Sequence, residues 1–342
     1  MKQNKLLIDI KHPAQLNLFK NLAIDLKNEN WDITICYLQR GKIPKIIEKE
    51  FQGFHTIPVG SSKGTKWSII WDGNIKRILT FLLLIFRNKY NICISASSVP
   101  LAVACKLTGT PVLQFYDDPE RKSLTKINAF LSTKIYFPFI VEQTDKIEVF
   151  NCLKEWSYLS PKRINPSTKV LQEYNLEKHN YVFVREVSNK SFNYYGQDDS
   201  VVLSFADKID KTVKIVLSLE DKSIKDKFPN DWILLEEPVS DIHALIYYSK
   251  LVISSGDSMA REGAMLGVPS IYCGFREMKA NNVLIKKGIL VHKTENEAIE
   301  YINQKINSNF EDSNQVAFRS QLAEEWDDMI DFMKQKINAF KK

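Results

Sequence analysis

Residues 251–274, LVISSGDSMAREGAMLGVPSIYCG, contain the pattern that decides the fold. The stretch opens with the apolar run LVI, whose β-branched members are typical of a buried parallel strand. Residues 254–258 are turn and helix-cap types, and residues 259–266 have helical spacing up to Gly267, which favours a left-handed end. Residues 270–273 then have the character of another strand. The stretch therefore predicts a strand–loop–helix–strand unit of a parallel sheet.

The loop before this helix is a candidate anion-binding site. Backbone N–H groups at a helix N-terminus, together with the positive end of the helix dipole, favour a bound anion, most often a phosphate. Glu262 lies one turn beyond Ser258 on the same side of the predicted helix. A carboxylate at that distance suits a ribose diol attached to the phosphates. The alternative is an ordinary turn in which Ser258 only caps the helix.

The composition is that of a globular protein. The 342 residues are enough for two domains of roughly 150 residues each, and 44% hydrophobic with 26% charged residues is ordinary. The formal charge of +6 suits anionic ligands or a membrane surface. Because no arginine-rich stripe or interleaved aromatic pattern occurs, we expect no nucleic-acid partner.

The cysteines indicate a reducing compartment. They are odd in number, far apart and mostly inside apolar runs, which predicts buried thiols without a disulfide framework or zinc site: Cys36, Cys93, Cys105, Cys152 and Cys273. The first apolar run is too short for a signal peptide and fits a strand over residues 5–10. We therefore expect a cytoplasmic protein, with association to a membrane left open.

Strands and helices alternate along both halves of the chain, and helices are expected over residues 13–28, 99–108, 198–208 and 295–307. This alternation predicts two Rossmann-like, doubly wound parallel-sheet domains of the α/β class facing across a cleft, at residues 1–160 and 161–320. The proline-containing segment 152–176 is the expected crossover. Residues 314–339 have the spacing of one long helix, and the final part, 321–342, is expected to return across the first domain.

The apolar helix expected over residues 75–86 is flanked by basic residues. It is too short to span a bilayer. It is either a core helix between the sheet and a neighbouring helix, or a face that docks on a membrane carrying a lipid-linked substrate.

Four loops are expected to carry the chemistry. Ligands of open parallel sheets bind at the carboxyl ends of the strands. The loops that follow predicted strands are Lys11-His12, residues 117–121, Arg185-Glu186 and residues 254–258. We expect these loops to converge at one site.

Several motifs carry a resemblance to known families. The segment SSGDSMAREGAMLGVP resembles the nucleotide-binding loop of GT-B glycosyltransferases and of non-hydrolysing UDP-N-acetylglucosamine 2-epimerases, which share one fold. The motifs DIKHPAQLNLFKNLA, FYDDPER, KEWSYLSPKRINPS and YVFVREVS resemble, in order, a family named only as domain of unknown function 354. That resemblance spans nearly the whole chain.

The resemblance implies a nucleotide-sugar held mainly by the second domain. Ser255, Gly256 and Ser258 would meet the diphosphate, and Glu262 the ribose hydroxyls. Arg185 would lie near the phosphates. The paired glycines of the epimerases are here Gly256 and Asp257, so Asp257 joins the expected site, pointing away from the phosphates or capping the helix.

The first functional hypothesis is glycosyl transfer from a UDP-sugar, without cofactor or metal, to a sugar or lipid-linked acceptor in surface-glycan synthesis. Helix amides and Arg185 would stabilise the leaving group. His12 is the expected base by position and by its ordinary pKa of about 6.5. Asp117 and Glu120 would be the base or bind acceptor hydroxyls. The structural alternatives are that His12 orients its loop and that the two acids only begin a helix.

Two other functions remain open. The first is epimerisation of a UDP-sugar, for which Asp117, Glu120 and Glu155 would supply carboxylates. The second is a non-catalytic nucleotide-sugar-binding subunit of a glycan assembly complex. Tyr158 and Arg163, with Glu155, either hold the domains together or touch substrate, and we assign structural roles to the remaining histidines: His55, His179, His243 and His292.

Overall fold

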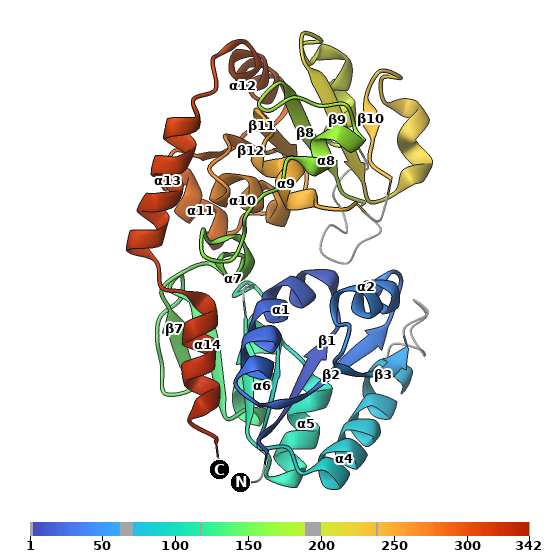
Figure 1. Ribbon diagram of the computed structural model, residues 1–342, viewed down its shortest axis with the longest axis vertical. Coiled ribbons are helices and arrows are strands. Elements are labelled where there is room, and N and C mark those ends of the chain that lie inside the picture. Colours follow the sequence, from blue (N-terminus) through green and yellow to red (C-terminus); the bar gives the residue numbers. More distant parts are fainter. Residues whose placement is uncertain (1–2, 62–70, 117, 189–199, 237–238, 342) are drawn as a thin grey trace. The chain divides into compact units, whose positions relative to one another are not determined.

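The computed structural model describes residues 3–61, 71–116, 118–188, 200–236 and 239–341. The chain divides into two compact units (Figure 1). Unit 1 is formed by Met1–Tyr158 and Trp326–Lys342, and unit 2 by Leu159–Glu325. Each unit is built around its own sheet, of seven strands in unit 1 and six in unit 2, and the strand pairs are parallel.

The sheet of unit 1 has the order β3-β2-β1-β4-β5-β6-β7. Successive strands are added toward one edge of the sheet from β1 to β3 and toward the other edge from β4 to β7. The boundary between β1 and β4 is therefore the switch point of a doubly wound fold. The strands are short apolar runs because helices cover both faces. Their bounds are β1 Lys5–Ile10, β2 Asp32–Gln39, β3 His55–Ser61, β4 Ile92–Ser95, β5 Val112–Phe115, β6 Lys134–Pro138 and β7 Ile147–Phe150.

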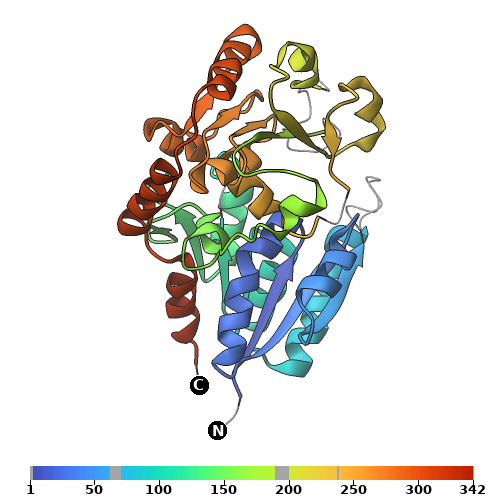
Figure 2. The same cartoon turned by 45° about the horizontal axis from the view of Figure 1, so that its top comes forward.

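Helices lie on both faces of this sheet. On one face α1 (Pro13–Asn28) packs with α2 (Ile43–Glu50) and with the C-terminal helix α14 (Met329–Asn338), and Figure 2 shows α1 lying along the strands. On the other face α4, α5 and α6 pack side by side. Their bounds are Lys76–Asn88, Val99–Thr108 and Lys122–Leu131, and the short π-helix η1 (Trp71–Ile75) leads into α4.

A buried ion pair connects α4 to the sheet of unit 1. Arg77 donates two hydrogen bonds of 2.6 Å to the Asp9 carboxylate on β1, and a third of 2.6 Å to the Val59 carbonyl on β3. Arg77 and Asp9 are fully buried. One turn and two turns further along α4, Phe81 and Ile85 face the same way and are buried. This inward stripe fixes which side of α4 faces solvent.

The sheet of unit 2 has the order β10-β9-β8-β11-β12-β13, with its switch point between β8 and β11. The strands are β8 Tyr181–Glu186, β9 Lys214–Leu219, β10 Ile233–Leu234, β11 Leu251–Ser254, β12 Ser270–Tyr272 and β13 Leu290–His292.

On one face of this sheet α10 (Asp257–Met265) packs between α9 (Ile242–Tyr247) and α11 (Lys279–Lys286), and α8 (Lys169–Glu173) packs on α9. Elsewhere α12 (Glu295–Asn307) packs on β11 and on the 3₁₀ helix η3 (Leu203–Lys208). Also in unit 2 are the 3₁₀ helix η4 (Lys222–Lys227) and α13 (Asp312–Glu325), and α7 (Trp156–Leu159) lies where the chain leaves unit 1.

Two glycines set the position of α10 on the sheet. A Cβ at Gly263 would lie 2.7 Å from Cγ2 of Val252 and 2.6 Å from Oγ of Ser270, so only glycine lets the helix approach β11 and β12 this closely. Gly267 follows the helix with φ +78°, and the Val268 and Gly267 amides bond back to the Gly263 and Ala264 carbonyls. This is a Schellman ending, so the predicted left-handed end at Gly267 is confirmed.

The prediction of one long C-terminal helix is wrong. The chain forms two helices, α13 and α14, separated near Asp328. The Asp328 carboxylate accepts hydrogen bonds from the Ile330 and Asp331 amides at 2.9 and 3.0 Å and caps α14. The capping aspartate starts a new helix here, because its side chain competes with the helical hydrogen bonds of the backbone. The break coincides with the passage of the chain from unit 2 back to unit 1.

Other expectations were right for most elements and incomplete for a few. The helices over 13–28, 99–108 and 295–307 and the strand over 5–10 are confirmed. The five cysteines are free and buried. The helix expected over 198–208 is, in its described part, only the short η3, while α6 and β13 were not anticipated. None of the described helices is long and apolar enough to cross a membrane.

Replacement of Arg77 by methionine should destabilise the protein by about 3–5 kcal/mol, because it leaves the Asp9 carboxylate buried without its partner. The matched control is Arg87→Met in the last turn of the same helix, which should change the free energy of unfolding by no more than about 0.5 kcal/mol. Urea unfolding measures both. The double variant Asp9→Leu/Arg77→Met should recover most of the loss, and a double variant no more stable than Arg77→Met would contradict this account.

Candidate functional site

The candidate site of unit 2 lies at the carboxyl edge of its sheet, at the switch point between β8 and β11. These strands pair directly, with Arg185 opposite Ser254, and the Ser255 amide donates to the Arg185 carbonyl at 3.0 Å. The helices that follow β8 and β11 leave on different sides of the sheet, so a crevice for ligands opens at this position in doubly wound folds. The sequence-predicted residues Arg185 and 254–258 are therefore neighbours in space.

Serine hydroxyls shape the loop between β11 and α10. Ser255 Oγ accepts the Val187 amide hydrogen at 2.9 Å, which ties the end of β11 to the chain beyond β8. Ser254 Oγ accepts from the Gly256 amide at 3.0 Å and donates to the Gly256 carbonyl at 2.7 Å. Ser255 is fully buried. Its hydroxyl is therefore engaged between the two loops in this structure. Of the predicted diphosphate contacts, Ser258 is the one that is partly exposed.

The N-terminus of α10 begins at Gly256. Its backbone is extended, with φ −105° and ψ 132°, and as a glycine it has no side chain to cap the helix. Ser258 does not cap the helix; its own amide donates to the Asp257 carboxylate at 2.8 Å. The first turn therefore has the backbone geometry that binds anions at helix N-termini.

Two arginines neutralise the acidic residue in this first turn. Asp257 is buried, and its Oδ2 lies 3.2 Å from Nη1 of Arg276 and 3.8 Å from Nη1 of Arg261. Arg261 also donates to the Asn281 Oδ1 at 2.8 Å and to the Ser258 Oγ at 3.4 Å. Both guanidinium groups lie close enough to offset the charge of this carboxylate. Asp257 therefore does not make this helix end repel a diphosphate.

Glu262 faces a histidine from the neighbouring helix. Its Oε2 lies 3.5 Å from Nε2 of His243, which is in the first turn of α9. The two side chains are 10% and 18% exposed, so the face of α10 that carries Glu262 is polar but largely covered. The sequence placed Glu262 one turn beyond Ser258, and α10 keeps both residues on one helix.

The end of β8 contributes one cation and one buried acid. Arg185 donates to the Ser218 hydroxyl on β9 at 2.9 Å. Glu186, the next residue, is buried, and its Oε2 accepts the Val202 and Leu203 amides at 2.7 and 3.1 Å. Burial raises the pKa of the Glu186 carboxyl above its ordinary value, while the hydrogen bond from Ser255 and the amide bonds oppose this rise.

In unit 1, the loop after β1 presents Lys11 and His12. Lys11 Nζ donates to the Ser97 carbonyl at 2.8 Å, and burial lowers the pKa of its ammonium to about 8, with Asp9 opposing the shift and Arg77 adding to it. His12 is exposed and caps α1, its Nδ1 accepting the Ala14 amide hydrogen at 3.3 Å. This cap favours the neutral tautomer with its proton on Nε2, so the imidazole must release the cap or move that proton to act as a base.

The predicted acids of unit 1 differ in their surroundings. Asp117 lies outside the described residues. Asp118 pairs with Arg121 at 3.2 Å, and Glu120 is exposed in the turn that precedes α6. Glu155 is 1% exposed, so a sugar could not reach its carboxylate in this structure. No group of three or more histidine, cysteine or acidic residues in the described part of the chain could hold a metal ion.

Sequence reasoning missed three neighbours of the loop: His243, Arg261 and Arg276. Arg276 had a usable signal, because it follows β12 and so lies at the same carboxyl edge as the loop. Arg261 follows Asp257 by four residues, a spacing that places both on one side of a helix. His243 had no local signal, since its approach to Glu262 depends on how α9 and α10 pack on the sheet.

The whole chain matches one family. Residues 4–341 match the family described as "Protein of unknown function (DUF354)". The chain belongs to this family, as its motifs indicated. The uncharacterized protein MJ0665 of Methanocaldococcus jannaschii is 22% identical over 317 residues, which are 87% of this chain and 91% of that protein.

Solved structures establish the fold. The glycosyltransferase VinC in complex with dTDP has a TM-score of 0.67 at 10% identity, over 98% of this chain and 99% of that chain. A putative UDP-N-acetylglucosamine 2-epimerase from Listeria monocytogenes has a TM-score of 0.71 at 11% identity, over 100% and 98%. With its two Rossmann-like sheets, the chain has the GT-B fold expected from its sequence.

Burial of Glu186 predicts a pH-dependent loss of stability. A carboxyl whose pKa is raised on folding holds its proton more tightly in the folded state, so its contribution is greatest below the ordinary carboxyl pKa and is lost as pH rises through the folded pKa. Glu186→Gln should remove this dependence. Urea unfolding between pH 4 and pH 8 should show that the free energy of unfolding of Glu186→Gln increases relative to that of the wild type as pH rises. Glu300→Gln, on the exposed side of α12, should show no such increase. Parallel curves for Glu186→Gln and wild type would contradict the assignment.

Proposed function

We propose that this chain is a glycosyltransferase that transfers a sugar from a nucleoside-diphosphate sugar to an acceptor. Unit 2 holds the donor in this proposal. The observation that carries it is the first turn of α10, which lies at the switch point of the sheet and places Asp257 between Arg261 and Arg276. Helix amides and two guanidinium groups beside the first turn together suit a diphosphate.

The donor's ribose is assigned to Glu262. A carboxylate accepts hydrogen bonds from a vicinal diol. The Nε2 of His243 lies 3.5 Å from the Glu262 Oε2 and would orient this carboxylate. Arg185, at the end of β8, stands across the switch point from the loop and supplies a further cation. In this assignment Ser254, Ser255 and Gly256 give the loop its shape and Ser258 donates to the phosphates.

The same groups would act in the chemical step. When the bond from the sugar to the diphosphate breaks, negative charge develops on the leaving oxygen, and the α10 amides with Arg276 or Arg185 would stabilise it. An inverting transfer also needs a base for the acceptor hydroxyl. His12, Asp117 and Glu120 in unit 1 are the candidates. His12 fits best if acceptor binding displaces the α1 cap and exposes Nδ1.

The acceptor is proposed to be a sugar or lipid-linked sugar in the synthesis of a surface glycan, which would place the protein in the cytoplasm or at the inner face of a membrane. The fold is shared by the glycosyltransferase VinC, seen with dTDP, and by proteins named UDP-N-acetylglucosamine 2-epimerases. Transfer ranks above epimerisation here because Glu155, one of the three carboxylates that epimerisation would recruit, is buried.

Calorimetric titration with UDP, dTDP and GDP tests the donor site. We expect one nucleotide to bind with micromolar affinity and without added metal. Ser258→Ala and Arg276→Met should each weaken it roughly tenfold or more, because each removes a donor to a charged group. Arg87→Met in unit 1 is the control and should leave affinity unchanged. Absence of binding by all three nucleotides would rule out the donor site.

The contact between His243 and Glu262 is tested by a double-mutant cycle. Glu262→Gln keeps the volume of the side chain but removes its charge, and should weaken nucleotide binding at least tenfold. If His243 acts by holding Glu262, then His243→Ala should cost affinity in the wild type and little more in the Glu262→Gln background. Additive losses would show that the two residues act independently.

Turnover separates the remaining functions. A transferase should release nucleoside diphosphate from a donor sugar faster when an acceptor is present. An epimerase should change the sugar without any acceptor, as followed by chromatography of the nucleotide-sugar. Tight binding with neither reaction would favour the non-catalytic subunit.

A further inference from the structure

An exposed apolar surface covers one face of unit 1. Of the twelve large apolar side chains that are exposed in the described residues, eight lie on η1, α4, α5 and α6. Phe86 is 81% exposed and Phe130 is 74% exposed. We call this set the α4–α6 surface: Trp71, Ile75, Leu79, Leu83, Phe86, Leu107, Ile127 and Phe130. Exposed apolar groups gathered in this way mark an interaction site rather than ordinary surface.

Helix geometry makes the α4 part of this surface a continuous stripe. Ile75, Leu79, Leu83 and Phe86 recur at spacings of four, four and three residues, which an α-helix brings to one side. The opposite side carries the buried residues Arg77, Phe81 and Ile85, so packing against the sheet leaves the stripe outward. It cannot turn inward without breaking the Asp9–Arg77 pair.

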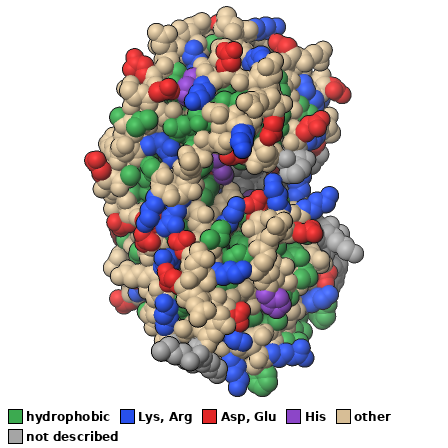
Figure 3. Space-filling model, in the orientation of Figure 1, with side chains coloured by type: hydrophobic (Ala, Val, Ile, Leu, Met, Phe, Trp, Pro, Cys, Tyr) green, Lys and Arg blue, Asp and Glu red, His purple; other side chains and the backbone are tan. Residues whose placement is uncertain are grey.

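The neighbouring helices extend the surface. In unit 1, α5 packs against both α4 and α6. Lys106 on α5 places its Nζ 5.5 Å from the ring centre of Phe130 on α6, so a cation lies directly over the apolar group. Figure 3 shows hydrophobic and basic side chains side by side at the lower end of unit 1, where Figure 1 places α4 and α5.

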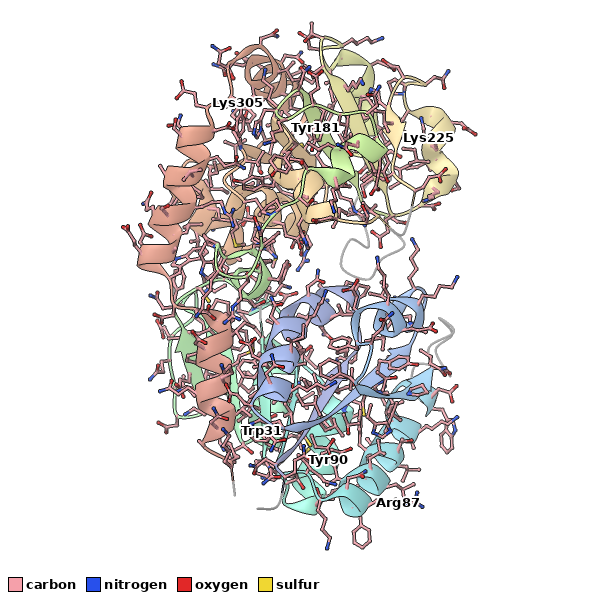
Figure 4. All side chains as sticks on the ribbon, viewed as in Figure 1. Trp31, Arg87, Tyr90, Tyr181, Lys225 and Lys305 are labelled. Carbon is pink, nitrogen blue, oxygen red and sulfur yellow. The ribbon has the colours of Figure 1, made fainter. Side chains whose placement is uncertain are left out.

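The charges on these helices have one sign. Average composition would place about four acidic residues in helices of 13, 10 and 10 residues, and α4, α5 and α6 contain none. They carry five basic residues besides the buried Arg77: Lys76, Arg87, Lys106, Lys122 and Lys126. On η1, which belongs to the same surface, Asp72 lies 4.0 Å from Lys76. Arg87 projects at the outer end of α4 (Figure 4), and Lys89 follows directly.

We propose that the α4–α6 surface docks on an anionic lipid bilayer. Apolar side chains of this size enter the headgroup–acyl boundary, while the surrounding lysines and arginines meet the negative headgroups. The proposed contact is peripheral, with the exposed side chains at the depth of the lipid headgroups. It concerns unit 1 alone and stands whether or not unit 2 binds a nucleotide.

A second copy of the chain fits this surface less well. A symmetric dimer brings the same surface of both copies together. Here that would bring Arg87 and Lys106 of one copy against the same cations of the other, with no acidic residue on α4, α5 or α6 between them, and like charges at an interface are unfavourable. A bilayer with anionic lipids supplies the missing charge.

Vesicle flotation of the full chain tests the proposal. The protein should bind vesicles in which about a third of the lipid is phosphatidylglycerol, and bind pure phosphatidylcholine at least tenfold more weakly. Binding should fall in 1 M salt, where the screening length shrinks from about 10 Å to about 3 Å. Equal binding to both vesicle types, or binding to neither, would overturn the proposal.

Variants assign the binding to this surface. Leu83→Ser/Phe86→Ser should weaken vesicle binding at least tenfold, and Arg87→Gln/Lys106→Gln should weaken it by roughly fivefold per charge. The control is Val316→Ser on α13 in unit 2, since Val316 at 56% and Leu83 at 58% are almost equally exposed. Undiminished binding by both double variants would refute the assignment. The assignment would also be refuted if sedimentation equilibrium showed a wild-type dimer and a monomeric Leu83→Ser/Phe86→Ser variant. That result would assign the surface to a second copy of the chain.

Discussion

The direct parallel pairing of β8 with β11 is the constraint on which the candidate donor site depends. The register sets Arg185 opposite Ser254, and it brings together two loops that are about seventy residues apart in the chain. Parallel strands end at a common edge, and their following helices begin there, so amide-rich helix N-termini collect at one place. Gly263 then fixes the distance of α10 from the sheet, because any side chain at this position would push the helix away from β11 and β12.

Buried charge is handled differently in the two units. In unit 1 the Asp9–Arg77 pair is closed on itself, with the guanidinium also bound to a strand carbonyl, and it serves to hold α4. In unit 2 the Asp257 carboxylate lies 3.2 Å from Arg276 and 3.8 Å from Arg261, in the first turn of a helix. The first arrangement fixes a helix on the sheet, whereas the second lies where helix amides favour a bound anion. That difference is why we propose a ligand for unit 2 from its helix N-terminus and guanidinium groups, and an interaction surface for unit 1 from exposure.

The sequence predicted most elements because their signals are local. The period of apolar residues gave α1, α5 and α12, and Gly267 gave the end of α10. It failed at Asp328, where a capping aspartate within an apparently continuous helical pattern begins a new helix. The roles of His12 as base and Ser255 as ligand group stay predictions. The sequence did not anticipate that Nδ1 of His12 accepts an amide hydrogen of α1, or that Oγ of Ser255 accepts the Val187 amide hydrogen. The hydrogen bonds of Asp328 and His12 are local, whereas that of Ser255 joins residues 68 apart in the chain.

The sequence by itself determined the fold class, the parallel alternation and the position of the loop between β11 and α10, since these follow from residues adjacent in the chain. Only the tertiary structure decided that Arg276 and Arg261 neutralise Asp257, that His243 faces Glu262, and that the apolar stripe of α4 points outward. Those facts depend on how separate helices pack on a common sheet. Helix packing brings together residues far apart in sequence, and no local pattern specifies which of them will meet.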